Sequence, residues 1–264
     1  MLELYHNDMS TCAQKVRLTL AEKGLEWKSH HLNLRAGETR TDSYKKLNPK
    51  GVVPTLIDDG TVIIESTVII EYLDDAYPEP PVKPGNLKSR AQMRLWTKQL
   101  DEGLHTDIGT ISGAVAFRYQ TIEGRTPEEL AAHMAKIPDP VRRERSTDTN
   151  THGIESKFFA PAIRNYDKLL SQLETALTEG PWLAGDTYSL ADIAYTPYLT
   201  RFEHLMFMGM LDERPRLADW YKRIKARPNY QIAIGDWLNK KYLPLMAGKG
   251  AEAWPRVKEI LAAG

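Results

Sequence analysis

The first part of the chain alternates short apolar runs, which predict strands, with stretches of helical periodicity. Strands are expected at residues 2–5, 27–32, 54–58 and 61–64. Helices are expected between residues 11 and 24, at 39–47 and between 66 and 77. Asp59-Gly60 separates the last two strands and predicts a hairpin, because both turn positions need a positive φ. This order predicts a βαβα unit followed by ββα, with a right-handed crossover between the first two strands.

Polar residues and glycine mark the ends of these helices. Apolar residues recur at helical spacing at Ala13, Val16 and Leu20 until Gly24, which is typical of a helix C-terminus. Ser66 is expected to be the N-cap of the third helix, because a serine side chain accepts hydrogen bonds from the exposed N–H groups of the first turn.

A proline-rich segment divides the chain. Residues 78–86 contain four prolines and one glycine, a density that neither a helix nor a central strand tolerates. Nearly every periodic stretch after this segment is helical. We therefore predict a thioredoxin-like α/β domain at 1–78, a linker at 79–86 and an all-helical domain at 87–264.

The expected helical domain begins with one long helix at about 87–119. Residues 121–155 are polar and interrupted by proline, and they predict an insertion with broken helix. Ser189 and Asp192 form the Ser-x-x-acid pattern of a capping box, which predicts a well-defined helix start. Further helices are expected at about 159–179 and after Pro215 and Pro228, followed by an aromatic tail.

Composition and charge exclude several classes of protein. The chain has 264 residues, 42% of them apolar, with 35 basic and 35 acidic side chains, so it has material for a core and no net field to attract nucleic acid. Its single cysteine forms neither an intramolecular disulfide nor a multi-thiolate zinc site, and we expect no metal. Neither a secretory leader nor a membrane-spanning apolar run is present, so we expect a cytoplasmic protein with no membrane partner.

Local motifs in a fixed order carry a resemblance to a known family. They are Ser10-Thr11-Cys12 at the start of the first helix, the Asn-Pro…Val-Pro-Thr-Leu stretch at 47–56, the acid-serine pair Glu65-Ser66, and the box at 189–192. Together they resemble the cytosolic glutathione transferase superfamily, which implies a thioredoxin-like domain joined to a helical domain. The Ser-x-Cys motif is similar to that of zeta-type enzymes and bacterial reductive dehalogenases, and other segments look like β-aryl-ether cleaving enzymes. The resemblance implies glutathione as co-substrate and a homodimer.

The glutathione-binding residues expected from this resemblance also fit the chemistry of the tripeptide. Ser66, at a helix N-terminus, offers N–H groups and a positive dipole end to a carboxylate, and Glu65 can take the ammonium group. An ordinary capped helix is the structural alternative for this pair. The Val53–Pro54 bond is expected to be cis, with Val53 pairing against the cysteinyl part of glutathione.

The loop before the first helix is expected to carry the chemistry. A free thiol has a pKa near 8.5, and lowering it by two units requires about 2.7 kcal/mol of thiolate stabilisation. A hydroxyl hydrogen bond and a helix N-terminus supply that order of magnitude, with Ser10 the first candidate and Thr11 the second. Ser10 is equally a plain helix cap. Cys12 either attacks a glutathionyl conjugate, as in reductive members of the family, or is packing.

The second-substrate site is expected to involve Met9, His105 and Asp101. His105 faces the ligand cleft in the family, and Asp101 lies one turn earlier; a solvated Asp/His pair is the alternative. Trp237 and Tyr242 are further candidates for an apolar pocket. The leading hypothesis is a transferase that directs the glutathione thiolate at a hydrophobic, aromatic electrophile. The alternatives are reductive dehalogenation, β-aryl-ether cleavage or thiol reduction through Cys12, and a binding protein without turnover.

Overall fold

The computed structural model describes residues 1–137 and 139–263. By compactness the chain divides into two units. Unit 1 comprises Met1–Lys98, Thr175–Leu199 and Arg216–Asn239, and unit 2 comprises Gln99–Glu174, Thr200–Pro215 and Lys240–Gly264. The boundaries of 1–78, 79–86 and 87–264 inferred from sequence composition stay a prediction.

Unit 1 is built on a four-stranded sheet with the order β2-β1-β3-β4. Its strands are β1 (Leu2–His6), β2 (Lys28–His31), β3 (Thr55–Asp58) and β4 (Thr61–Ile64). β1 and β2 are parallel and β3 and β4 are antiparallel, as predicted. The structure adds the antiparallel pairing of β3 with β1. The hairpin turn is confirmed: Asp59 has φ 43° and Gly60 has φ 84°.

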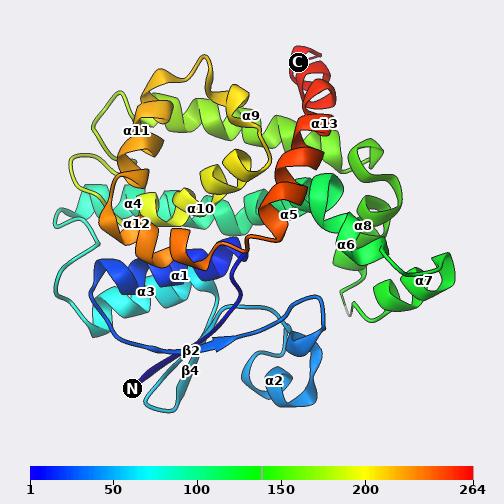
Figure 1. The fold of residues 1–264 in the computed structure, drawn as a ribbon. Coiled ribbons are helices and arrows are strands. Elements are labelled where there is room, and N and C mark those ends of the chain that lie inside the picture. The colour runs from blue at the N-terminus through cyan, green and yellow to red at the C-terminus, as the bar shows by residue number, and fades with distance from the viewer. Residues whose placement is uncertain (138, 264) are drawn as a thin grey trace. The chain divides into compact units, whose positions relative to one another are not determined.

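Helices α1 and α3 lie on one side of this sheet (Figure 1) and pack against each other. The helical elements of this part of the chain are α1 (Thr11–Glu22), η1 (Glu38–Arg40), α2 (Asp42–Leu47), α3 (Ser66–Ala76) and α4 (Leu87–Gln99). Leu4, Val16 and Ile69 are fully buried between the layers, so the apolar periodicity of the sequence marks the core faces. Gly24 follows α1 with φ 61°, as expected for a C-terminal cap.

The capping box at Ser189 and Asp192 is confirmed and forms a fully buried polar cluster in unit 1. The Asp192 carboxylate accepts hydrogen bonds from Ser189 N (2.9 Å), Ser189 Oγ (3.2 Å), Leu183 N (3.0 Å) and Trp220 Nε1 (2.8 Å). Burial raises the pKa of Asp192, and these donors oppose that shift. The box therefore starts α10 (Leu190–His204) and also ties it to α11 (Pro215–Lys225).

The prediction of one long helix over 87–119 is wrong in detail. The helix after α4 continues as η2 (Leu100–Leu104), α5 (His105–Ser112), η3 (Gly113–Phe117) and α6 (Arg118–Ile122), with π-helical turns in η2 and η3. Gly103 has φ 145° and ψ −32°, values outside the helical region, and it kinks the chain. Apolar spacing does not reveal such kinks, because the periodicity is kept on both sides.

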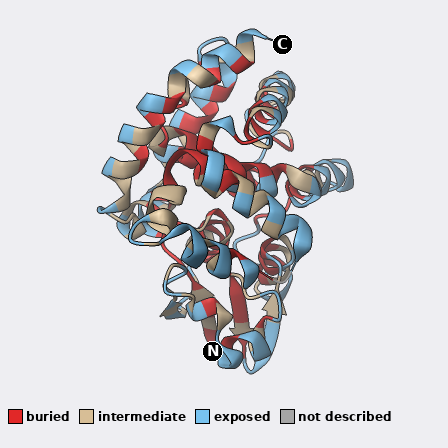
Figure 2. Ribbon diagram, turned by 90° about the vertical axis from the view of Figure 1, so that its right-hand side faces the viewer, coloured by how far each residue is buried: buried red, intermediate tan, exposed pale blue. Residues whose placement is uncertain are grey.

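The helices expected to begin at Phe159 and after Pro215 and Pro228 are confirmed, and residues 121–155 contain separate short helices as the broken pattern predicts. The remaining helical elements are α7 (Pro127–Ala135), α8 (Pro140–His152), η4 (Gly153–Glu155), α9 (Phe159–Ala176), η5 (Met208–Leu211), α12 (Pro228–Ala233), η6 (Gly235–Trp237) and α13 (Tyr242–Ala262). The expected aromatic tail is thus largely the 21-residue helix α13. Figure 2 shows buried residues concentrated on the inward sides of the helices and exposed residues outside them.

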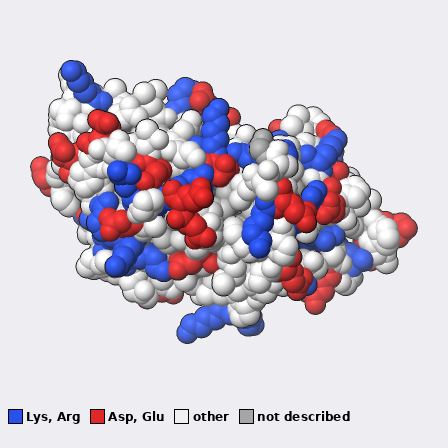
Figure 3. Space-filling model, turned by 90° about the horizontal axis from the view of Figure 1, so that it is seen from above, with Lys and Arg blue, Asp and Glu red and all other residues white. Residues whose placement is uncertain are grey.

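The surface carries charges of both signs. On the face seen in Figure 3, lysine and arginine side chains interleave with aspartate and glutamate. Among the described residues, none of the helices is long and apolar enough to cross a membrane.

Candidate active site

The register of the sheet brings the sequence motifs to one end of it. Tyr5 of β1 is paired with Thr55 of β3, and Thr55 is paired with Ile64 of β4. The loop after β1, the turn before β3 and the segment after β4 therefore start from neighbouring positions at the same sheet end. Helices α1 and α3 both begin there. Two helix N-termini and an irregular backbone segment meet at this end, an arrangement suited to an anionic ligand.

Ser10 is the N-cap of α1. Its Oγ accepts a hydrogen bond from Ala13 N at 3.2 Å, and its carbonyl accepts one from Gln14 N at 2.9 Å. A hydroxyl has one proton and two lone pairs, so this capping bond leaves the Ser10 proton available to donate. Within residues 1–137 and 139–263 that hydroxyl donates to no protein acceptor. Capping and thiolate binding are therefore compatible roles for the same oxygen.

Thr11 and Cys12 occupy the first turn of α1. Thr11 is 6% exposed, whereas the Cys12 residue is half-buried. Both lie where the N–H groups of the helix have no intrahelical acceptor and the dipole is positive. Thr11 and Cys12, the two alternatives to Ser10 as the catalytic residue, therefore lie at the same helix N-terminus.

The turn before β3 contains the cis peptide bond Val53–Pro54, as expected from the motif. Val52, one residue earlier, is held in place because its carbonyl accepts from Tyr44 Oη (2.7 Å) and Asn48 Nδ2 (2.9 Å). Neither the N–H nor the C=O of Val53 makes a hydrogen bond within the described part of the chain. The turn therefore leaves one backbone donor and one backbone acceptor available for hydrogen bonding.

Tyr44 is a buried residue that the sequence did not single out. Its hydroxyl also lies 2.9 Å from Thr55 Oγ1, and burial raises the pKa of Tyr44. The hydroxyl therefore stays protonated and can donate to the turn at neutral pH. An aromatic residue on a short polar helix gives no signal of this role.

The placement of Ser66 as N-cap is wrong by one residue. Glu65 is the N-cap of α3, with φ 68° and ψ 112°, and its carbonyl accepts from Ile69 N at 2.8 Å. A positive φ at a non-glycine residue is uncommon and is a feature of ligand sites. Ser66 is the first helical residue and is 7% exposed. The exposed Glu65 carboxylate lies 2.7 Å from Lys50 Nζ.

A buried hydrogen-bond network, which the sequence analysis does not predict, supports the loop before Ser10. Arg17, 1% exposed, donates to the carbonyls of Asn7 (3.0 Å) and Asp8 (3.1 Å). The Asp8 carboxylate accepts from Met9 N at 2.7 Å. Arginine is rarely buried, so the sequence predicts that Arg17 lies on the surface. Only the structure reveals that it holds the loop in place.

The expected second-substrate residues lie in different units. Met9 is 5% exposed in unit 1, whereas Asp101 and His105 are exposed residues of unit 2. Asp101 lies in the π-helical η2 and His105 starts α5, with the kink at Gly103 between them. The regular i, i+4 geometry assumed from the sequence is therefore not kept.

The sequence matches a family of known proteins. The N-terminal domain of glutathione S-transferase matches residues 9–76, and the C-terminal domain matches residues 128–223. Protein LigF of Sphingobium sp. is 32% identical over 234 residues, with 86% of this chain and 90% of LigF covered. The chain belongs to the glutathione S-transferase family. Its N-terminal sheet domain and helical C-terminal domain are those of the family.

Other glutathione S-transferase relatives differ in their reactions. Glutathione S-transferase Z2 of Arabidopsis thaliana is 30% identical, covering 88% of this chain and 90% of that protein. A tetrachloro-p-hydroquinone reductive dehalogenase of Sphingobium chlorophenolicum is 27% identical, covering 88% and 95%. The crystal structure of the β-etherase LigF superposes with a TM-score of 0.79 at 31% identity, covering 89% of this chain and 99% of that one. In residues 1–137 and 139–263 no group of three or more His, Cys, Asp or Glu is placed to hold a metal.

Proposed function

We propose that this protein is a glutathione transferase that directs the glutathione thiolate at a hydrophobic, aromatic electrophile. The observation that carries the proposal is the meeting of the Ser10 cap, the Val53 backbone and the start of α3 at one sheet end. Glutathione has two carboxylates, an ammonium group and a thiol. Ser66 and the first turn of α3 would bind a carboxylate, Glu65 the ammonium group, and Val53 the central residue of the tripeptide.

Ser10 would stabilise the thiolate. Its oxygen already accepts from Ala13 N, so the capping bond does not use its proton, which can be donated to sulfur. A hydrogen bond to an anion contributes about 1.5–3 kcal/mol, and the helix N-terminus adds about 0.3–1 kcal/mol. Together these lower a thiol pKa by about two units, which makes much of the bound glutathione nucleophilic at neutral pH.

The reaction is a substitution at carbon. The thiolate forms a C–S bond while the bond from that carbon to the leaving group breaks, and the leaving group departs with the electron pair. The thiol proton is released to solvent when the thiolate forms. Because the related LigF is a β-etherase, a β-aryl ether with a phenolate leaving group is the substrate class to test first.

The test is conjugation kinetics with a β-aryl-ether model compound and with 1-chloro-2,4-dinitrobenzene as a general electrophile. We expect a glutathione thioether with at least one of them, and loss of most of the rate in Ser10→Ala. Glutathione binding without turnover of either compound would instead favour a binding protein.

Cys12 carries the alternative reaction. The Cys12 thiolate would attack the sulfur of a glutathionyl conjugate, so that a Cys12–glutathione disulfide forms while the C–S bond breaks and the released carbon takes a proton from solvent. Cys12→Ser would then abolish reductive chemistry and leave simple conjugation intact, and mass spectrometry would detect a glutathionyl adduct on Cys12. The dehalogenase relative is the observation in favour of this alternative. We further propose that the protein is a cytoplasmic homodimer that acts in detoxification or the degradation of aromatic compounds; sedimentation velocity tests the dimer.

A further inference from the structure

His31, the last residue of β2, is hydrogen-bonded to the loop that precedes Ser10. The backbone N–H of Asp8 donates to His31 Nε2 at 3.2 Å. A ring nitrogen that accepts a hydrogen bond carries no proton, so this ring is neutral, with its proton on Nδ1. The bond therefore depends on one protonation state of a histidine side chain.

The other hydrogen bonds of Asp8 come from donors that do not titrate near neutral pH. Its carboxylate accepts from Met9 N at 2.7 Å and from Asn239 Nδ2 at 2.8 Å. Its carbonyl accepts from Arg17 Nη2 at 3.1 Å. Backbone amides, side-chain amides and a guanidinium keep their protons between pH 5 and 8. Asp8 is 9% exposed, so its N–H relies on His31 rather than on bulk water for an acceptor.

Protonation of His31 reverses the direction of hydrogen bonding at Nε2. A protonated imidazole has two N–H donors and no acceptor, so the Asp8 N–H would face a second donor. The same nitrogen lies 3.8 Å from Asp8 Oδ2 and, once charged, is attracted to that oxygen. The ring then exchanges its bond to the backbone for one to the carboxylate, and a buried N–H loses its acceptor. Both changes act on the residue two positions before Ser10.

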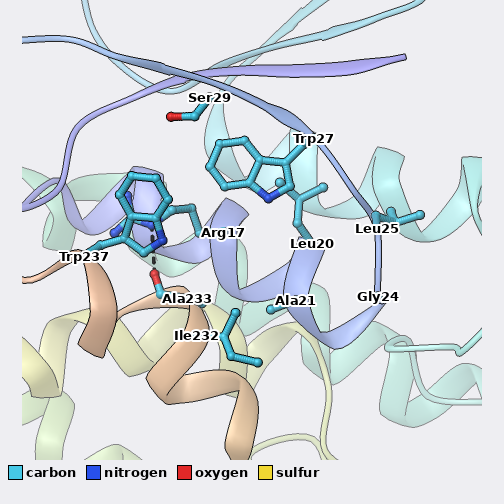
Figure 4. Close-up of a pocket in the computed structure, with 10 residues that line it drawn as sticks. All are labelled: Arg17, Leu20, Ala21, Gly24, Leu25, Trp27, Ser29, Ile232, Ala233 and Trp237. Atoms are coloured by element: carbon cyan, nitrogen blue, oxygen red, sulfur yellow. Dashed lines mark hydrogen bonds between the residues drawn. The ribbon is translucent and has the colours of Figure 1, made fainter.

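The titratable and charged groups around His31 keep their charge over the same pH range. The His6 ring of β1 is nearly perpendicular to the His31 ring, with centroids 5.5 Å apart, and burial and the charge of Arg17 lower the pKa of His6 to about 3. Arg17 of α1 donates to His6 Nδ1 at 3.1 Å and to the Ala233 carbonyl at 2.8 Å, beside a pocket of about 450 Å³ (Figure 4). Burial lowers the pKa of Arg17 to about 9, and Asp8 opposes that shift, so the guanidinium stays charged at neutral pH. Among these groups, the His31 side chain, 42% exposed, is the one that takes up a proton between pH 5 and 8.

We propose that His31 is a positioning residue for the transferase reaction: its neutral ring fixes the loop before Ser10, and its protonation moves that loop and the Ser10 hydroxyl away from the glutathione sulfur. The proposal rests on the proposed role of Ser10 as thiolate donor. A misplacement of about 1 Å in such a group lowers a rate by up to about a hundredfold. Acid would therefore slow the reaction twice, by protonating the thiolate and by protonating His31.

The test is the pH dependence of kcat/KM for conjugation of glutathione to 1-chloro-2,4-dinitrobenzene. His31→Gln keeps an acceptor for the Asp8 N–H without a titrating ring, so only the thiol titration should remain in its profile. Between pH 6 and pH 5 we expect the kcat/KM of the parent chain to fall about tenfold further than that of His31→Gln. His31→Ala offers no acceptor and should be about tenfold slower than His31→Gln at pH 8.

His30→Gln is the matched control for the pH profile. His30 precedes His31 on β2, so its side chain belongs to the other face of the sheet, where it stacks on Tyr5 at 4.3 Å and lies 2.7 Å from Glu3 Oε2. This variant should keep the parent profile. A parent profile no steeper than that of His31→Gln would overturn the proposal, and so would identical profiles for the two glutamine variants.

A second measurement needs no turnover. In proton–nitrogen correlation spectra of the isotope-labelled full chain, the amide resonances of Asp8 and Ser10 should shift together between pH 5 and 8. The shift should be absent in His31→Gln and present in His30→Gln. Resonances that do not respond to pH would overturn the proposal, whatever the rates show. If the resonances respond but no glutathione thioether forms, the transferase function is wrong, while control of the loop by His31 is supported.

Discussion

Replacing Ser10 by alanine removes one function that the structure shows and a second that we propose for the same hydroxyl. The first is the cap on α1, where Oγ accepts from Ala13 N at 3.2 Å; its loss costs about 1 kcal/mol of stability. The second is the proposed hydrogen bond to the glutathione thiolate. At about 1.5–3 kcal/mol for a bond to an anion, its loss raises the pKa of the bound thiol by about one to two units.

Both effects are measured on the same variant. The thiolate absorbance of bound glutathione is titrated against pH, and urea unfolding gives the free energy. We expect Ser10→Ala to shift the titration upward and to lower the rate at pH 6.5 about tenfold or more. Thr126→Ala is the control, because it removes the cap of α7, a 3.3 Å bond to Glu129 N, and should change stability without changing the titration.

One outcome would refute the assignment to Ser10. If Ser10→Ala unfolds more easily but binds glutathione with an unchanged thiol titration, Ser10 is a cap and nothing more. Thr11→Val in the same assay then tests the second hydroxyl at this helix end.

The remaining predictions concern stability. Gly250→Ala should cost at least about 2 kcal/mol, because its Cβ would lie 1.9 Å from the Leu205 carbonyl oxygen. Gly248→Ala on the same helix meets nothing within 4 Å and should stabilise by about 0.5–1 kcal/mol. Asp192→Ala should cost about 3–5 kcal/mol in urea unfolding, because it leaves buried donors unpaired. Burial lowers the pKa of His6 from its ordinary value of 6.5 to about 3, so stability is kept above pH 6.5 and is lost as the pH falls, by about 3 kcal/mol at pH 4.5.

The controls for these predictions lie in the same chain. His6→Asn keeps an acceptor for Arg17 without a titrating ring, so its stability should fall less steeply between pH 6.5 and 4.5; parallel slopes would contradict the buried neutral histidine. Equal effects of the two glycine substitutions would contradict the close contact at Gly250. An Asp192→Ala variant as stable as the parent chain would mean that its donors find water.

Much of the fold was predictable because its signals are local. The hairpin needs only Asp59-Gly60 between two apolar runs, and the box at Ser189 needs only an acid three residues later. The kink at Gly103 was not predictable. A glycine inside a periodic helical pattern indicates only a small loss of helix stability, and nothing in the pattern indicates that its φ is 145°. The one-residue error at Ser66 has a similar cause, since a strained Glu65 as N-cap goes against residue preference.

The candidate site was predictable where motif and local structure coincide. Ser10 as a cap and the cis bond at Val53–Pro54 follow from short segments. The role of Tyr44 could not be predicted in this way, because its hydroxyl donates to the carbonyl of Val52, eight residues later in the chain. Contacts between distant positions depend on packing, and one sequence gives no measure of them.

The buried Arg17 network explains how the loop gains its shape. Nearby apolar residues enclose α1, so Arg17 cannot reach water and must find acceptors inside the protein. The carbonyls of Asn7 and Asp8 supply them, which fixes the backbone just before Met9 and Ser10. The other acceptors of Arg17 are the Ala233 carbonyl and the His6 ring, whose Nε2 lies 2.8 Å from Ser29 Oγ. One arginine, held between the loop after β1 and the end of α12, thus sets the geometry of the backbone before the proposed thiolate donor.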